Sequence, residues 1–379
     1  MKMSNGFIRN LYFILLSSMG GLVLILLGLD IGWIIGTLIT AALLSFKGPN
    51  WLKDPNQQKK GMPPYWLRIG QTILAVELGR KINLAVISTF QEYWMPITIM
   101  LLISVVFSLL SGFLIWKFSK TDLITSLFAT APGGIVVMPG LAQDVGANTG
   151  VVSIVQTLRV FLVVILIPMI ASTWIATVTS PVASYPAVST SVVDFKLSHL
   201  LGTLLLFLAA WGGKYVGKIL KFPSPVLIGG MAGVAVVQGL YLIIFGTELV
   251  IWRPAIILII AQVLMASSIG ARFQKSMFQN IGKLLIVACI STVIFILAML
   301  LCAIFVSEIT GISLITSVLA FAPGGVAEMA ATAIVLGADS TFVVAVQVLR
   351  IVVVLLVLPP IFKMVGNQTI KQKDSEVTI

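Results

Sequence analysis

Twelve apolar segments, separated by short polar stretches, account for most of the 379 residues of this chain. They fall at about 11–29, 31–46, 65–79, 95–116, 123–143, 150–172, 198–213, 225–245, 252–270, 283–306, 312–337 and 341–364. A helix needs about 20 apolar residues to cross a bilayer. Only 10% of the residues are charged, against roughly 25% in an average soluble domain. The sequence therefore predicts an all-α polytopic protein of the lipid bilayer and excludes a soluble enzyme, a disordered regulator and a disulfide scaffold.

The net charge is +11, from 24 Lys and Arg against 13 Asp and Glu. Cytoplasmic loops of membrane proteins are rich in Lys and Arg, which accounts for this excess without a nucleic-acid partner. The longest polar stretches, 47–65 and 367–379, are too short to fold as a DNA-binding domain. We therefore expect no contact with nucleic acid.

A tract of 45 residues occurs twice, 191 residues apart. Ile124–Pro168 aligns without a gap to Ile315–Pro359, and 19 of the 45 positions are identical. The same offset matches Gln71 to Gln262, and a small gap brings Ile-Ile-Gly at 34–36 onto Leu-Ile-Gly at 227–229. Such self-similarity predicts two structural repeats. We place them at 1–172 and 198–379, the second with a short cytoplasmic tail, joined by a Ser-, Thr- and Pro-rich external linker at 173–197.

Loop charges predict how the two repeats face. If all twelve segments crossed, the uncharged linker would lie inside and the basic loop at 214–221 outside, contrary to the positive-inside rule. If the fifth segment of each half enters and returns on the same side, the linker lies outside and both termini lie inside. We therefore predict inverted repeats of five crossing helices, each with one re-entrant segment.

Each fifth segment is interrupted by Ala-Pro-Gly-Gly, at 131–134 and at 322–325. Proline removes a backbone donor and clashes with the preceding turn, and glycine relaxes the helix further. Paired helix breaks in corresponding positions of two halves are a pointer to a transporter's binding site, although Pro and Gly also serve as kinks or packing points in membrane helices. The candidate substrate-binding residues at the breaks are Pro132, Gly133, Gly134, Pro323, Gly324 and Gly325.

Arg159 and Arg350 each lie nine residues into the last span of their half. A central arginine costs roughly 2.5–3.5 kcal/mol on insertion scales, so two at matching positions need a reason. The guanidinium fork can hold a carboxylate or phosphate by two hydrogen bonds, and the alternative is an internal ion pair that fixes helix packing. Gln156 and Gln347 precede the arginines by one turn on the same face and are candidate substrate ligands with them.

Glu328 follows the second break, where the first repeat has Val137. It could pair with an arginine, bind a cation or carry a proton, and we take it as the candidate coupling residue for Na⁺ or H⁺. The pairs Asn148-Thr149 and Asp339-Ser340 precede the last spans and are typical helix N-caps, although a helix N-terminus can also bind an anion.

The residues that catalysis would require are scarce. His199 is the only histidine, whereas a copper or iron oxygenase site needs several His and carboxylate ligands. The sequence has no P-loop, so we expect no ATP hydrolysis. We therefore expect no enzymatic activity, no cofactor and no metal site.

Two halves, each with an Ala-Pro-Gly-Gly break followed by a Gln-x-x-Leu-Arg span, resemble the bacterial membrane AbrB duplication family over essentially the whole chain. Its members carry the names ammonia monooxygenase and AbrB-like regulator of gene expression. A monooxygenase would need more histidines than the one in this chain. A DNA-binding regulator would need a DNA-binding segment, and this sequence has none. The resemblance implies a multi-pass protein of the bacterial inner membrane. The predicted architecture is also similar to that of sodium-coupled glutamate and citrate symporters, an analogy of fold alone.

The sequence favours a secondary transporter for a small anionic organic solute, with alternating access around the paired broken helices. Three alternatives remain open at this point. One is a membrane sensor that influences gene expression without flux, and another is a flippase for a lipid-linked anion. The third is a membrane enzyme, which would need catalytic groups that the sequence does not offer. Small-residue helix faces leave a homo-oligomer open as well.

Overall fold

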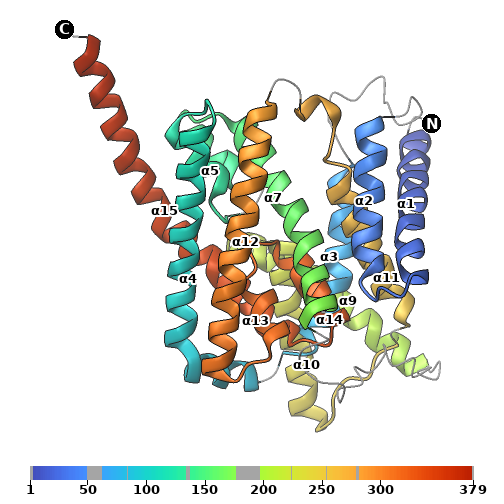
Figure 1. Cartoon of the computed structure of the whole chain (residues 1–379). Helices are drawn as coiled ribbons and strands as arrows, with labels where there is room; N and C mark the ends of the chain where they lie inside the picture. Colours follow the sequence, from blue (N-terminus) through green and yellow to red (C-terminus); the bar gives the residue numbers. More distant parts are fainter. Residues whose placement is uncertain are drawn as a thin grey trace. The chain divides into compact units, whose positions relative to one another are not determined.

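A computed structural model describes residues 3–48, 62–82, 84–133, 137–175, 197–222, 224–252, 254–278 and 281–377. In this part of the chain every regular element is a helix (Figure 1), which confirms the predicted all-α fold class. Gly134 and linker residues 176–196 lie outside it.

The chain forms two compact units, and neither coincides with a sequence repeat. Unit 1 consists of Met1–Ser88, Pro168–Ser276 and Ala327–Phe342. Unit 2 consists of Thr89–Ile167, Met277–Val326 and Val343–Ile379. Each unit therefore combines corresponding helices of both repeats, so that equivalent residues of the two halves meet within one unit.

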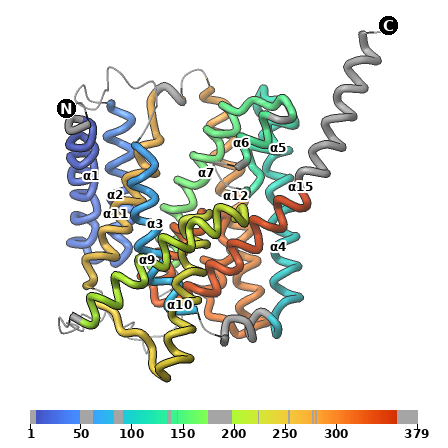
Figure 2. The backbone as a smooth tube through the Cα atoms, turned by 180° about the vertical axis from the view of Figure 1, so that it is seen from behind, coloured from blue at the N-terminus to red at the C-terminus, as the bar shows by residue number. Residues whose placement is uncertain are grey.

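Unit 1 contains the first three helices of each repeat and most of α14, the second helix of the second broken segment. Its elements are α1 (Met3–Leu26), α2 (Gly32–Lys47), α3 (Pro64–Gly79), η2 (Ala171–Ile175), α9 (Leu197–Ile219), η3 (Pro225–Gly229), α10 (Gly230–Phe245), α11 (Ala255–Gly270) and α14 (Val326–Val335), with the short η4 (Lys275–Phe278) at the boundary. Helices α1 and α2 lie side by side in both views (Figures 1 and 2).

Glycines bring the first two helices of each half into backbone contact. A Cβ on Gly36 would lie 2.2 Å from the carbonyl oxygen of Gly20, and a Cβ on Gly213 would lie 2.2 Å from that of Gly229. Small residues allow helix backbones to approach this closely. Gly20 and Gly36 precede Gly213 and Gly229 by 193 residues, the gapped offset predicted for these helices, so the same contact recurs in both halves.

The third helix of each half packs against the second helix of the other. A Cβ on Gly79 of α3 would lie 2.7 Å from Cβ of Val234 on α10, and one on Gly270 of α11 would lie 2.6 Å from Cβ of Ala41 on α2. These are equivalent pairs of residues with the halves exchanged. Such an exchange is the contact pattern of a two-fold relation.

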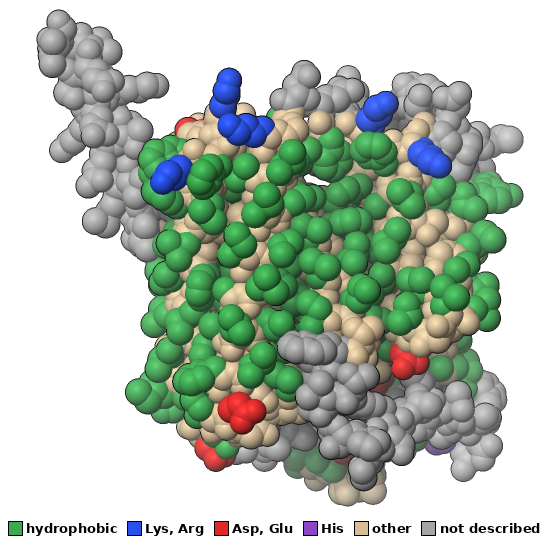
Figure 3. Space-filling model, in the orientation of Figure 1, with side chains coloured by type: hydrophobic (Ala, Val, Ile, Leu, Met, Phe, Trp, Pro, Cys, Tyr) green, Lys and Arg blue, Asp and Glu red, His purple; other side chains and the backbone are tan. Residues whose placement is uncertain are grey.

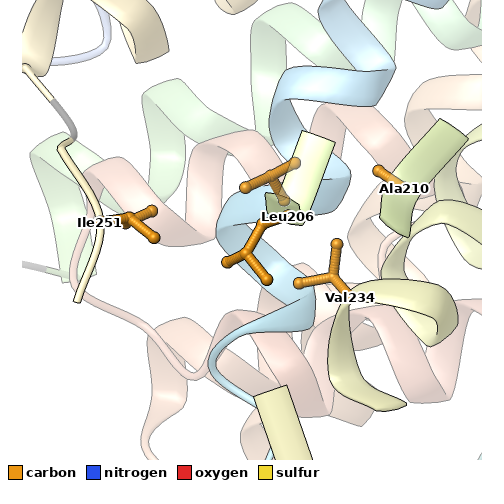
Figure 4. Close-up of a cluster of buried hydrophobic side chains, with 5 residues drawn as sticks. Leu206, Ala210, Val234 and Ile251 are labelled. Carbon is orange, nitrogen blue, oxygen red and sulfur yellow. The ribbon is translucent and has the colours of Figure 1, made fainter. Parts of the chain in front are cut away.

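An apolar cluster joins α9 and α10 to α3 and to the irregular segment between α10 and α11 (Figure 4). It consists of Val76, Leu206, Ala210, Val234 and Ile251, all at most 5% exposed. Burying a side chain of this kind contributes about 1.5–3 kcal/mol. The cluster makes the α3, α9 and α10 group one packed body.

Unit 2 contains the last three segments of each repeat, except most of α14. Its helices are α4 (Leu84–Phe118), α5 (Leu123–Thr130), α6 (Val137–Asp144), α7 (Thr149–Ile170), α12 (Gly282–Thr310), α13 (Leu314–Phe321) and α15 (Ser340–Val377). Helix α4 bends at Tyr93, whose φ of −111° and ψ of 23° are not helical, three residues before Pro96. Helices α4 and α12 lie side by side and run in opposite directions (Figure 1), joined by a hydrogen bond from Ser111 Oγ to the carbonyl oxygen of Ser291 (3.2 Å).

Seven helices in the described part of the chain are long and apolar enough to cross a membrane. Helices α2, α3 and α11 have 16 residues each, about 24 Å of helix against a hydrocarbon core of about 30 Å. The predicted count of ten crossings therefore stays a prediction. Hydrophobic side chains dominate the face seen in Figure 3, as expected of a multi-pass membrane protein.

Two predicted boundaries move. The last helix of the first repeat continues through η2 to Ile175, past the predicted start of the linker at 173. Helix α15 continues to Val377, so the predicted polar tail is helical up to that residue. Local hydropathy locates the end of an apolar run, whereas backbone hydrogen bonding can carry a helix beyond it.

Candidate functional site

The two Ala-Pro-Gly-Gly sequences end helices at equivalent positions. Helix α5 ends at Thr130 and α13 at Phe321, and the next residues, Ala131 and Ala322, have ψ values of 129° and 136°. A residue before proline disfavours the α-helical region for steric reasons, so the last helical residue lies two positions before the proline in both halves. The predicted helix breaks are therefore present in both halves.

The breaks share their local geometry. The Gly133 amide donates to the carbonyl oxygen of Ala131 (2.9 Å), and the Gly324 amide donates to that of Ala322 (2.8 Å). A Cβ on Gly133 would lie 1.7 Å from Cε of Met138, so a side chain there would require the flexible Met138 side chain to shift. Pro132 and Pro323 are buried, and Gly324 and Gly325 are partly exposed.

In the first half, Gln156 and Arg159 of α7 cap the end of α5. Nε2 of Gln156 donates to the carbonyl oxygens of Phe128 (3.1 Å) and Ala131 (2.7 Å). Nη1 of Arg159 donates to the carbonyl oxygens of Thr130 (2.7 Å) and Ala131 (3.2 Å). The last carbonyls of a helix have no partner within it, so these two side chains satisfy groups that the break exposes.

In the second half, Gln347 and Arg350 of α15 do the same for α13. Nε2 of Gln347 donates to the carbonyl oxygens of Leu319 (2.9 Å) and Ala322 (3.0 Å). Arg350 donates through Nη1 to the carbonyl oxygen of Ala322 and through Nη2 to that of Gly324 (2.9 Å). The glutamine contacts correspond residue for residue to those of the first half.

Each glutamine also holds its arginine. Nη2 of Arg159 donates to Oε1 of Gln156 (2.8 Å), and Nη2 of Arg350 donates to Oε1 of Gln347. Because the amide nitrogen of each glutamine is bound to backbone carbonyls, its oxygen is turned toward the guanidinium group. The glutamine thus links the helix end to the charged side chain.

The two arginines bring uncompensated positive charge into unit 2. Arg159 is 4% exposed and Arg350 is 3% exposed. None of the carboxylates described in unit 2 lies within 4.0 Å of either group. Their charge is offset only in part, by the negative C-terminal ends of α5 and α13.

Each guanidinium group keeps one nitrogen atom, Nε, without a hydrogen-bond partner among the described residues. Nε of Arg159 and Nε of Arg350 are buried and have no hydrogen-bond acceptor among the residues that the structure describes. Buried polar groups are nearly always hydrogen-bonded, and an exception calls for an explanation. A donor on a positively charged group forms its strongest hydrogen bond with an anion, which accepts it.

The first broken segment turns back on itself. The Asp122 carboxylate accepts from the Thr125 amide (2.8 Å) at the start of α5, and Oγ1 of Thr125 accepts from the Asn148 amide (2.9 Å) just before α7. Helices α5 and α6 pack together between these points and have 8 residues each, about 12 Å of helix. The predicted re-entry of this segment on one side of the membrane stays a prediction.

Asn148 and Asp339 act as helix caps. Oδ1 of Asn148 accepts from the Val151 amide (3.1 Å), and Oδ1 of Asp339 accepts from the amides of Thr341 and Phe342 (3.0 Å each). Left-handed Gly146 (φ 74°) and Gly337 (φ 67°) make the turns before them, at equivalent positions of the two halves. Of the two sequence interpretations, helix capping is the one whose contacts are present.

Glu328 has an electrostatic partner that sequence reasoning missed. It lies in the first turn of α14, partly exposed, and interacts with Arg272, which follows α11 in the same unit. The two charges form no direct ion pair within 4.0 Å. The sequence signal that pointed to a basic residue at Arg272 was the 191-residue offset, which aligns Arg272 with Lys81 of the first half.

The first half neutralises its corresponding cations differently. Glu77 of α3 accepts from Nε (3.2 Å) and Nη2 (3.1 Å) of Arg80, and its Oε1 lies 4.0 Å from Nζ of Lys81. The residue equivalent to Glu77 in α11 is Ser268. In the second half the carboxylate near these cations is Glu328 of the broken segment, and none stands at the position equivalent to Glu77 near the end of the third helix.

A search of the described residues finds no group of three or more His, Cys, Asp or Glu side chains arranged to hold a metal ion. Glu328 therefore belongs to no such cluster among the described residues. The polar groups that converge at the breaks are guanidinium, amide and backbone groups.

Comparison with known proteins extends across both repeats. The AbrB family, described as "Transition state regulatory protein AbrB", matches residues 33–366. A Bacillus subtilis (strain 168) protein named "Uncharacterized protein YhjN" is 46% identical over 381 residues, covering 100% of this chain and 99% of the relative. An Escherichia coli (strain K12) protein named "Putative regulator AbrB" is 27% identical over 310 residues, covering 80% of this chain and 83% of the relative.

Proposed function

Because this chain belongs to the AbrB family, with membrane-spanning helices over both repeats, we propose that it is a secondary transporter for a small anionic organic solute. One observation carries the proposal. Two buried arginines, neutralised by no described carboxylate of unit 2, hold the ends of two equivalent broken helices within one compact unit.

The charge balance supports an anionic ligand. A buried charge that lacks a counter-charge is strongly destabilising. Helix ends and glutamine amides compensate part of this cost. A bound anion would compensate the rest, so the site should favour occupancy by a negative group over water.

The architecture supports transport. Paired broken helices in two repeats are how many secondary transporters build a site between membrane faces, and the two units supply bodies that can move in alternating access. The proposal places the chain in the bacterial inner membrane with both termini cytoplasmic, in contact with lipid and not with nucleic acid. It assigns the chain no enzymatic step, cofactor or metal.

Coupling is assigned to Glu328. A carboxylate that is partly exposed and near Arg272 without a direct ion pair can exchange its partner for Na⁺ or H⁺. Its position three residues after Gly325 ties it covalently to the second break. Binding of the coupling ion there would be transmitted to the helix end that Arg350 caps.

A sensor is the second candidate, because the Escherichia coli relative is named as a regulator. A sensor would use the same anion site and would show binding without flux. An influence on gene expression would then pass through another protein, since the described segments are membrane-type helices.

The decisive experiment has two steps. The detergent-purified protein is first heated with a panel of organic anions in Na⁺ or K⁺, because a ligand at 100 times its Kd stabilises by about 2.7 kcal/mol. Each anion that stabilises is then radiolabelled and offered to proteoliposomes. Uptake that Arg350→Met abolishes and exposed Arg68→Met retains supports the transporter. Stabilisation without uptake supports the sensor, and a panel without any stabilising anion overturns the anion site.

A further inference from the structure

We propose that the C-terminal end of α9 binds the headgroup of an anionic phospholipid, with Lys214, Lys218 and Lys221 as its cationic ligands. This inference goes beyond the proposed function, because it concerns the surface of unit 1 and not the arginines of unit 2. It follows from a comparison of two equivalent helix ends, from the aromatic contacts of one lysine and from the exposed face that leads to the lysines.

Helices α9 and α1 end in the same backbone motif. After α9, the Lys221 amide donates to the carbonyl oxygen of Lys218 (3.2 Å), and the Phe222 amide donates to that of Gly217 (2.9 Å). The same two hydrogen bonds (2.9 and 3.1 Å) follow α1, at residues 193 positions earlier. This pair of bonds is a Schellman motif. The two repeats therefore supply the same turn with different side chains.

The residue at the left-handed position of the turn differs between the repeats. Gly28 has a φ of 86°, and its equivalent Lys221 has a φ of 55°. Lys221 is the only residue other than glycine with a positive φ among those that the structure describes. Glycine adopts this conformation without steric cost and is the usual residue there. A lysine at a strained position indicates that its side chain has a task.

Two more lysines distinguish this helix end from its counterpart. The residues of α1 equivalent to Lys214 and Lys218 are Gly21 and Ile25. None of the carboxylates in the described part of the chain lies within 4.0 Å of the three ammonium groups. A bias toward cytoplasmic lysines can be met at any position of a loop, so it does not account for the strained one. The three charges are available to an external anion.

Aromatic rings hold one of these charges in place. Nζ of Lys214 lies 4.7 Å from the ring centroid of Tyr215 and 5.7 Å from that of Trp211. The two rings meet edge to face, with centroids 5.2 Å apart. Both side chains are exposed, and exposed Trp and Tyr in membrane helices favour the level of the lipid headgroups. Cation–π attraction therefore fixes the ammonium group at that level.

An apolar face of α9 leads to the lysines. Leu204, Leu208, Trp211 and Tyr215 are exposed and follow one another at helical spacing, and Lys218 continues the same face. The opposite face, with Leu206 and Ala210, packs in the cluster of Figure 4. An acyl chain can lie along the exposed face while the phosphate contacts the lysines. The apolar face makes a lipid the occupant, since a free phosphate ion would use the lysines alone.

The test measures lipid binding by native mass spectrometry of the detergent-purified full chain. The probes are dioleoyl phosphatidylglycerol and dioleoyl phosphatidylcholine, which share their acyl chains and differ in net charge. The variants are Lys214→Gln, Lys218→Gln and Lys221→Gly, and the last restores the glycine of the first repeat. Lys283→Gln, at an exposed lysine in the first turn of α12, is the matched control.

We expect the first phosphatidylglycerol to bind about tenfold or more tightly than phosphatidylcholine. Each of the three variants should weaken phosphatidylglycerol by about fivefold, the effect of one lysine near an anionic headgroup, and the control should not. Lys221→Gly should also raise the thermal midpoint in lipid-free detergent, because it relieves the left-handed lysine. This variant folds with the turn that Gly28 already makes, so the test stands even if a glutamine variant fails to fold.

Several results would overturn the inference. Equal affinities for the two lipids, or an equal loss in the Lys283→Gln control, would mean that the end of α9 does not select a headgroup. Displacement of phosphatidylglycerol by millimolar inorganic phosphate would assign the lysines to a free ion. A dimer that the lysine variants dissociate would assign this face to a second copy of the chain. None of these results bears on the anion site at Arg159 and Arg350.

Discussion

Arg159 of α7 and Arg350 of α15, 191 residues apart in the sequence, donate through Nη1 to equivalent carbonyl oxygens within unit 2, those of Ala131 and Ala322. Each is held in place by the carbonyl end of a broken helix and by a glutamine one turn earlier. The arginines therefore have a structural task as helix caps and still carry the charge and the free Nε donor that an anion needs. Both roles can be tested separately.

The capping role predicts a loss of stability when the guanidinium group of Arg350 is removed. Arg350→Met removes the side-chain donor of the Gly324 carbonyl and one of the three donors of the Ala322 carbonyl, which keeps Gln347 and the Gly324 amide; a hydrogen bond from a charged group contributes about 1.5–3 kcal/mol. The thermal midpoint in detergent, without added anion, should fall clearly. Arg68→Met removes an exposed arginine and should leave the midpoint nearly unchanged. An unchanged midpoint for Arg350→Met would show that the caps contribute nothing.

Gln347→Leu should destabilise the protein by about 1–3 kcal/mol, because Leu319 and Ala322 lose the amide donor and Arg350 loses an acceptor. Chemical denaturation of the detergent-solubilised protein measures the change. Gln143→Leu, at an exposed glutamine of α6, is the matched control. Equal effects of the two substitutions would contradict the role assigned to Gln347.

Adjacent glycines on α9 provide a test of backbone packing. A Cβ on Gly213 would lie 2.2 Å from the Gly229 carbonyl oxygen, whereas a Cβ on Gly212 would meet nothing within 4 Å. Gly213→Ala should therefore cost about 1–3 kcal/mol through overpacking. Gly212→Ala should be neutral or should stabilise by up to about 1 kcal/mol through helix propensity. Thermal midpoints that do not separate the two variants would refute the close contact.

The electrostatic interaction of Arg272 with Glu328 predicts that substitutions of the two residues are energetically coupled. Arg272→Gln and Glu328→Gln should each destabilise the protein, and the double variant should cost less than their sum by about 0.5–1 kcal/mol. The cycle of Arg272→Gln with Glu308→Gln, an exposed carboxylate of α12, should be additive. In proteoliposomes, Glu328→Gln should also abolish dependence of uptake on the coupling ion. Retained ion dependence would remove Glu328 from the coupling site.

The hairpin in the first half predicts a labelling pattern. Lys120 before α5 and Val145 after α6 are both exposed, and the Thr125–Asn148 hydrogen bond brings the two ends of the segment together. In a Cys289→Ser/Cys302→Ser background, Lys120→Cys and Val145→Cys should react from the same side of the membrane, the cytoplasmic one, with an impermeant thiol reagent. Labelling from opposite sides would mean that the segment crosses fully.

Much of the fold was predictable because its causes are local or repeated. Runs of apolar residues determine membrane helices, and a proline keeps the residue before it out of the helical region, as at Ala131 and Ala322. The 191-residue offset identified the two halves, and it singled out Arg159 and Arg350 as an equivalent pair. These inferences need no knowledge of which helix lies beside which.

The sequence by itself determined that the chain is an all-α membrane protein with two broken helices and two central arginines. The tertiary structure decided what those arginines contact, since their partners are backbone carbonyls, which every residue carries and no residue type reveals. It also decided that equivalent helices of the two halves share a unit, and that Glu328 interacts with Arg272. Such relations depend on long-range packing, in which segments far apart in the chain become neighbours, and local hydropathy and helix-breaking signals contain no record of that proximity.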